Sequence, residues 1–190
     1  MNTFVKTLFV VGCMGAFVPN VLYSQLIGNT FPPMPTSTAN GKEVNLPIDT
    51  KGKYTLLGLA FSRKSEDDLQ TWMEPVYWKF IDKSEGQIDQ LFAGVSNHDV
   101  NAYFVPMFTG IKTAATSAAK KKALQRMDKR LIPNILFYKG KLKPYKEALD
   151  FQRKDIPYFF VLDKDGVIVY ATSGGYSDKK MEQVEEAIAD

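Results

Sequence analysis

Two runs of β-branched and aromatic residues near the C-terminus, at 158–162 and 167–170, flank the polar segment Asp163-Lys164-Asp165-Gly166. Strands are rich in such residues, and glycine adopts the positive φ of a tight turn without steric cost. The pattern therefore predicts a β-hairpin. Pro157 stands at the start of its first strand, where a missing N–H does least harm to the hydrogen-bond ladder.

A nearly continuous apolar run over 54–61 predicts a central parallel strand that is covered on both faces. The next segment predicts a helix with Ser65 as its N-cap and Pro75 as an internal kink. Its apolar residues recur at intervals of three and four, which is typical of one buried helix face. They are Leu69, Trp72, Met73, Val76, Tyr77, Phe80 and Ile81.

Shorter patterns predict the remaining elements. Asn40-Gly41 is a strong two-residue turn signal, so 36–46 is expected to form a hairpin. In the middle of the chain we expect a helix extension at Ile88, Leu91 and Phe92, a second parallel strand over 100–108 and a helix over 111–131. A short strand over 134–138 and a short helix or turn over 145–151 follow. The last expected helix is capped by Ser177 and has Met181, Val184 and Ile188 on one side.

The order of these pieces resembles the thioredoxin-like superfamily, most closely its thiol-reductase and peroxiredoxin-type members. The residues that carry the resemblance are Ile156, Pro157, Asp163 and Gly166, followed by Gly174, Gly175 and the closing helix. The resemblance covers 31–188 and implies an α/β fold with a central mixed sheet, helices on both faces and an N-terminal β-hairpin. It also implies a cis peptide bond before Pro157.

Composition agrees with one globular domain, since 190 residues with 45% hydrophobic content can bury a sizeable core. Residues 1–24 combine Lys6 with a short apolar run, which predicts a signal peptide cleaved near Ser24 and leaves 25–190 as the thioredoxin-like domain. Lipidation at Cys13, where 10–13 loosely matches a lipobox, and a retained anchor are the alternatives. The protein is therefore expected to be exported, to the periplasm or cell envelope of a bacterium.

Cys13 is the only cysteine, so the chain can form no internal disulfide. In thioredoxin-like proteins the reactive cysteine lies where the first central strand meets the kinked helix, whose dipole lowers the thiol pKa. Counting from the strand places that pair at 64–67, and counting back from Pro75 places it at 67–70. Neither segment contains a cysteine. Thiol chemistry is therefore not expected.

The sequence offers few residues for a serine nucleophile, a metal site or an anion site. A serine nucleophile needs a base, and His98, in a polar loop, is the only histidine. One histidine and one cysteine also predict no metal site, and no motif predicts a cofactor. An anion could bind Arg63 and Lys64 at the helix start, although a self-capped, solvated helix end is the simpler interpretation.

A binding site is predicted instead between the strand–helix loop and the mouth of the C-terminal hairpin, where active relatives pair with an extended substrate. Its residues are Ser62, Arg63, Lys64, Ser65, Ile156, Pro157 and Tyr158. Trp78 lies off the apolar stripe of its helix and is a candidate for a further exposed contact.

Positive charge is concentrated between 112 and 146. Such a patch suits anionic lipid headgroups or an acidic protein partner, whereas a solvated helix face whose lysines pair with acids elsewhere is the alternative. Nucleic acid is not an expected partner, because the patch has no interleaved aromatic residues. The residues of the predicted patch are Lys120, Lys121, Lys122, Arg126, Lys129 and Arg130.

Four short motifs resemble the mitochondrial ATP synthase assembly factor family, thioredoxin-like chaperones without the cysteine pair. They are 71–75, 108–110, 137–140 and 158–163. Together the resemblances imply an exported, redox-inactive domain that binds a protein or peptide as a chaperone-like assembly module of the cell envelope. A thioredoxin-fold protein of an oxidoreductase family, with an enzymatic activity that needs no cysteine, is the alternative.

Overall fold

The computed structural model describes residues 23–82, 99–109, 118, 120–122, 124–125 and 127–189. The leader up to residue 22, the extension with Ile88, Leu91 and Phe92, the loop with His98, and residues 111–117, 119, 123 and Arg126 of the predicted helix over 111–131 lie outside these residues. The helices and strands, in chain order, are β1 (Met34–Ser37), β2 (Glu43–Leu46), η2 (Ile48–Thr50), β3 (Thr55–Ala60), α1 (Arg63–Val76), η3 (Tyr77–Ile81), β4 (Asn101–Thr109), η4 (Lys129–Asn134), β5 (Phe137–Gly140), α4 (Lys143–Ala148), β6 (Tyr158–Leu162), β7 (Ile168–Ser173) and α5 (Asp178–Ala189).

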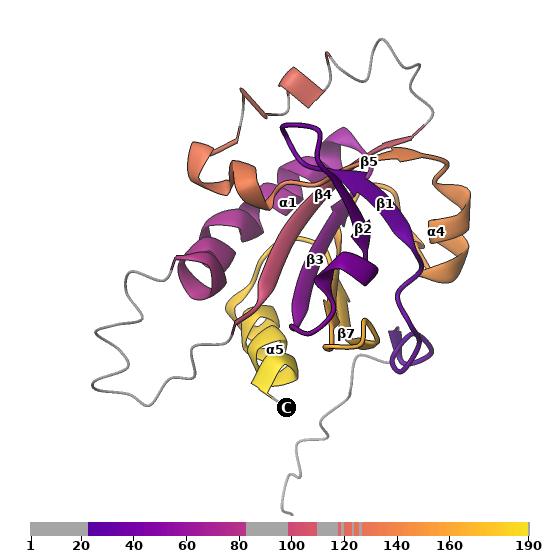
Figure 1. Ribbon diagram of the computed structural model, residues 1–190. Coiled ribbons are helices and arrows are strands. Elements are labelled where there is room, and N and C mark those ends of the chain that lie inside the picture. The colour runs from indigo at the N-terminus through magenta and orange to yellow at the C-terminus, as the bar shows by residue number, and fades with distance from the viewer. Residues whose placement is uncertain are drawn as a thin grey trace, which may run out of the picture.

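The strands form one mixed seven-stranded sheet in the order β2-β1-β5-β4-β3-β6-β7 (Figure 1). β4 runs parallel to both β3 and β5, and the other neighbouring strands are antiparallel. All six residues of β3 are buried, as the apolar run predicted. β3 thus lies inside the sheet, with a parallel neighbour on one side and an antiparallel one on the other.

Alternate residues of the central strands serve two separate cores. Leu56, Phe159 and Val161 face a core that α1 and α5 cover, whereas Leu57 and Phe160 face a core on the opposite side of the sheet. The second core is closed by α4 and by the segment that begins at 23. Helices therefore cover both faces, because a two-residue period points successive side chains of a strand in opposite directions.

The predicted C-terminal hairpin is confirmed, with β6 and β7 joined by a turn at 163–167. The carboxylate of Asp163 accepts hydrogen bonds from the backbone N–H groups of Asp165 and Val167, both at 2.9 Å. Gly166 has φ of 84°, the left-handed conformation that favours glycine in such a turn. The hairpin is therefore closed by local side-chain-to-backbone hydrogen bonds.

The N-terminal hairpin is also confirmed, but its connection is longer than predicted. The strand register ends at the pair Ser37 and Glu43, so five residues form the loop instead of two. Thr38 explains the difference, because its N–H donates to the carbonyl of Lys42 at 2.9 Å and its hydroxyl accepts from the N–H of Lys42 at 3.0 Å. Within this connection a tight turn is kept, because the N–H of Gly41, with φ of 89°, donates to the carbonyl of Thr38 at 3.1 Å.

Two features differ from the remaining expectations. The bond before Pro157 is trans, so the cis bond that the resemblance implied is wrong; the cis bond of the described residues precedes Pro47. Tyr23 is 4% exposed and meets Tyr158 edge-on, so the folded part includes a residue upstream of Gln25. Cleavage near Ser24 stays a prediction. No helix within the described part of the chain combines the length and the apolar character that a membrane span needs.

Candidate functional site

The junction between β3 and α1 is closed by two serines. Ser62 keeps the extended conformation of the strand (φ −144°, ψ 161°) and is the N-cap of α1. Its Oγ accepts from the N–H of Ser65 at 3.1 Å, and Oγ of Ser65 accepts from the N–H of Ser62 at 2.9 Å and of Phe61 at 3.1 Å. The two side chains form a capping box. The prediction of Ser65 as N-cap was wrong by three residues.

The resemblance to thioredoxin-like proteins places their reactive cysteine at a strand–helix junction of this kind. The junction holds Ser62 and Ser65, three positions apart, and the two counted segments, 64–67 and 67–70, both lie within α1. Oγ of Ser65 donates to the carbonyl of Ser62 at 2.9 Å, and the residue is fully buried. No histidine lies within the described residues that could act as a base. The observed role of the two serines is therefore helix capping.

The predicted binding segments lie side by side, but aromatic rings fill the space between them. Phe61 lies 5.0 Å from the ring centroid of Phe151 and 6.0 Å from that of Tyr158, stacked on both. Pro157 and Tyr158 are buried. The Tyr158 hydroxyl accepts from the N–H of Arg153 at 2.7 Å and donates to its carbonyl at 3.0 Å. Of the predicted set, Ser62, Arg63, Lys64 and Ile156 keep exposed surface.

A cavity of about 530 Å³ lies against another side of the same helix start. We call it the α1–β4 cavity, because the first turns of α1 and the C-terminal end of β4 form most of its wall. Its lining residues are Phe61, Ser62, Arg63, Glu66, Asp67, Leu69, Gln70, Met73, Pro106, Met107, Phe108, Thr109, Lys122 and Met127. Ser62 and Arg63 are the members of the predicted binding site that line it.

The electrostatics of this cavity are mixed. Arg63 pairs with Asp67 at 3.6 Å across one helical turn, and both side chains are exposed. Exposed pairs of this kind contribute little stability, so their charges remain available to a ligand. The sequence signal that could have located the cavity is the end of β4, because ligands of open α/β sheets bind outside the carboxyl ends of parallel strands.

The predicted basic patch divides into parts with different neighbours. The Arg130 guanidinium donates to the Asp128 carboxylate at 2.6 and 3.0 Å, which raises the pKa of Arg130 and lowers that of Asp128. It also lies 4.6 Å from the ring centroid of Tyr77 and 5.4 Å from that of Trp78. Trp78 is 43% exposed, as predicted. In this part of the patch, Asp128 neutralises the charge of Arg130, and the guanidinium lies on the aromatic rings.

Lys120 and its neighbours form the other part. The Lys120 ammonium donates to the carbonyl of Thr38 at 2.7 Å and stands 4.7 Å from the ring centroid of Phe137. Burial lowers the pKa of Lys120. A second hollow of about 720 Å³, which we call the lysine groove, begins here. It is lined by Ala39, Asn40, Gly41, Lys120, Lys121, Leu124, Gln125, Met127, Lys129 and Ile132.

Metal ligands do not cluster in the described part of the chain. Within it, no group of three or more His, Cys, Asp and Glu side chains lies close enough to hold an ion.

No family model and no curated protein matches the chain. Three solved structures share its fold. BsSco, of the Sco family of cytochrome c oxidase assembly proteins, is 14% identical with a TM-score of 0.54, over 85% of this chain and 95% of its own. A candidate protein disulfide isomerase from Bacteroides thetaiotaomicron is 15% identical (TM-score 0.54; 86% and 91%). The 2-Cys peroxiredoxin of Plasmodium vivax is 16% identical (TM-score 0.51; 86% and 82%).

Identities this low show the fold alone. The predicted fold class, a thioredoxin-like α/β domain with a mixed sheet and an N-terminal hairpin, is confirmed. The single cysteine makes this chain a degenerate example of that fold.

Proposed function

We propose that this protein is a redox-inactive thioredoxin-fold module, exported to the cell envelope, that holds a segment of a partner protein in the α1–β4 cavity. The observation that carries the proposal is the capping box of Ser62 and Ser65. Both serines occupy the junction where the fold otherwise carries its reactive thiols, and both hydroxyls are used to cap α1. An alcohol cannot exchange with a disulfide, so recognition is the use that remains at this junction.

The shape and lining of the cavity support a polypeptide ligand. Phe61 and Met127, both half-buried, supply apolar surface, whereas Arg63 and Glu66 add opposite charges to the lining. Its volume of about 530 Å³ is in the range of small-ligand and side-chain pockets. Methionine and aliphatic linings adapt to different side chains, as is common at peptide-binding surfaces. An apolar anchor residue with polar neighbours fits this arrangement.

An assembly role is the form of binding that we favour. The name of the Sco family describes assembly proteins of cytochrome c oxidase, and BsSco shares the fold of this chain. The motifs that resemble the ATP synthase assembly factors and the predicted leader support the same role at a membrane. These resemblances support the choice of partner, whereas the capping box supports the absence of thiol chemistry.

A photo-crosslinking residue at Gln70, exposed on the cavity wall, tests the proposal in cells of the native host. The matched control carries the same residue at Glu182, exposed on α5. We expect a discrete adduct with one partner from position 70 and none from position 182. Equal adducts from both positions, or none, would overturn the site. Turnover of insulin disulfides or hydroperoxide above background would overturn the redox-inactive assignment.

A further inference from the structure

The lysine groove has a one-sided charge. Three ammonium groups line it, from Lys120, Lys121 and Lys129, and no carboxylate is among its lining residues. Asp128 is next to Lys129 in the chain, but its carboxylate is bound to Arg130. Positive charge in this groove is therefore not balanced by the groove's own walls.

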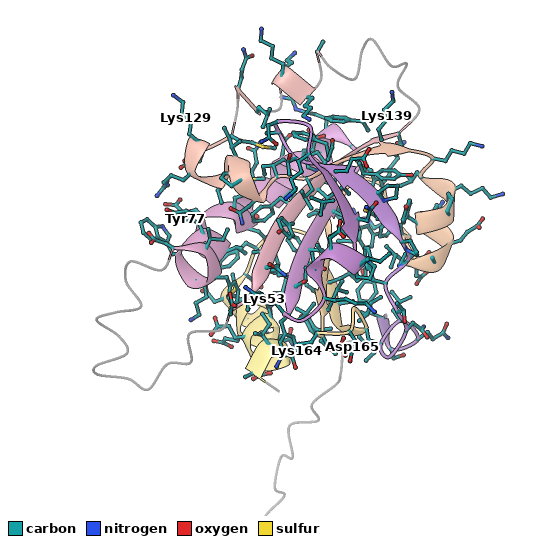
Figure 2. All side chains as sticks on the ribbon, in the orientation of Figure 1. Lys53, Tyr77, Lys129, Lys139, Lys164 and Asp165 are labelled. Carbon is teal, nitrogen blue, oxygen red and sulfur yellow. The ribbon has the colours of Figure 1, made fainter. Side chains whose placement is uncertain are left out.

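Two of these lysines also have no acidic partner elsewhere in the described residues. Neither Lys121 nor Lys129 makes an ion pair there, and both are exposed. In Figure 2 the Lys129 side chain extends away from the body of the protein. Among the described residues, the predicted alternative of lysines that pair with acids elsewhere is therefore not seen for these two. Like charges repel one another, and an anionic ligand would relieve that repulsion.

The floor of the groove is apolar. Ala39 comes from the loop between β1 and β2, and Leu124, Met127 and Ile132 come from the opposite wall; all four are half-buried. A free inorganic anion would leave this surface exposed to water. Lipid headgroups would pair with the lysines, but they carry no apolar side chains for the half-buried part of the lining. A chain that carries both carboxylates and apolar side chains satisfies both parts of the groove.

The groove shares one lining residue with the proposed binding site. Met127 lines both the lysine groove and the α1–β4 cavity, so the two hollows meet at this side chain. An extended peptide advances about 3.3 Å per residue, so a few residues are enough to pass from one hollow to the next. Lys122, in the wall of the α1–β4 cavity, continues the positive charge toward that side.

We propose that the lysine groove binds an acidic amphipathic segment of the same partner protein, in which carboxylates alternate with apolar side chains. This inference rests on the proposed function for the partner, but it concerns a different set of side chains. The carboxylates lie against Lys121 and Lys129 at the rim, and the apolar side chains lie on Leu124, Met127 and Ile132.

Two fluorescein-labelled peptides test this proposal by fluorescence anisotropy with the intact protein. One alternates Glu with Leu, and the other alternates Glu with Ser at the same length and charge. We expect the Glu-Leu peptide to bind about ten-fold more tightly, because only its side chains can bury apolar surface. We also expect its affinity to fall steeply as salt rises from about 50 to 300 mM, over which the screening length shortens.

Three variants locate the site. The double change Lys121→Glu and Lys129→Glu should weaken binding of the Glu-Leu peptide by about ten-fold or more. The control, Lys51→Glu with Lys179→Glu, changes the net charge equally at two exposed lysines outside the groove and should stay within about two-fold. Ala39→Trp adds a large side chain to the apolar part of the groove without a change of charge. It should weaken binding of the Glu-Leu peptide as much as the charge reversal does.

The other outcomes overturn the inference. If vesicles of phosphatidylglycerol bind with the same dependence on Lys121 and Lys129 while Ala39→Trp has no effect, the patch is a membrane-binding surface. Failure of both peptides to bind, or equal binding of both, excludes an amphipathic ligand. If the adduct from Gln70 persists in that case, only the groove assignment fails; if that adduct is absent too, the proposed function fails with it.

Discussion

Replacement of Ser65 by alanine tests the interpretation of the β3–α1 junction as a capping structure. The side chain is fully buried, and its oxygen accepts from the N–H groups of Phe61 and Ser62. A buried donor without a partner costs about 1–3 kcal/mol, and loss of a helix cap costs typically about 1 kcal/mol. Because these N–H groups are only partly buried, we expect a loss of about 2–3 kcal/mol for Ser65→Ala.

Ser62→Ala is the matched control, because the Ser62 hydroxyl accepts from one backbone N–H, that of Ser65. Its loss should be about 1 kcal/mol. For a domain of this size each kcal/mol lowers the Tm by about 2–4 °C, so we expect decreases of roughly 4–12 °C for Ser65→Ala and 2–4 °C for Ser62→Ala. Urea unfolding followed by circular dichroism measures both free energies. An equal or larger loss in Ser62→Ala would refute the assignment of Ser65 as the central acceptor.

Three further predictions address the junction, the core and the alkaline limit of stability. The double change Ser62→Cys and Ser65→Cys, made in a chain whose natural cysteine is replaced by serine, should form an internal disulfide, since positions i and i+3 lie within bonding reach. Without reductant, the two thiols should then resist alkylation. Two free thiols after oxidation would contradict this prediction. Gly58→Ala should destabilise the fold by about 1–3 kcal/mol in urea unfolding, because the added Cβ would lie 2.6 Å from a ring carbon of Phe159; an unchanged midpoint would contradict this. Burial raises the pKa of Tyr145 to about 12, above its ordinary value of 10.0, so its stabilising contribution is complete below pH 10 and is lost as pH rises toward 12. The urea midpoint of Tyr145→Phe should therefore decrease less steeply with pH over that range than the midpoint of the unchanged protein. An unchanged slope would show that Tyr145 does not cause the loss of stability.

The β-strands and helices were predictable where the spacing of apolar residues shows which face of the element is buried. The apolar run of β3 and the three-and-four spacing of α1 both describe which side chains are buried, and the structure buries them. The start of α1 was not predictable in the same way, because Ser62-x-x-Ser65 and Ser65-x-x-Asp68 are both plausible capping sequences. The choice depends on where β3 ends, and pairing with β4 and β6 sets that end.

The candidate site depends on contacts that no short segment contains. The sequence predicted a groove beside Tyr158, where the rings of Phe61, Phe151 and Tyr158 pack on one another; that site stays a prediction. The cavity lies instead where the end of β4 and Met127 approach α1. A period of two or of 3.6 residues tells which face of an element is buried, but it does not tell which distant side chain covers that face.

The amino-acid sequence by itself determined the chemistry that is missing, because a chain with one cysteine cannot carry a thiol pair on any fold. It also determined the sign of the charge between 112 and 146. The tertiary structure alone decided that Ser62 and Ser65 meet at the strand–helix junction, and that three lysines line one hollow together with half-buried apolar side chains. Composition and local order follow from covalent structure, whereas the side chains that share a cavity are chosen by packing between elements far apart in the chain.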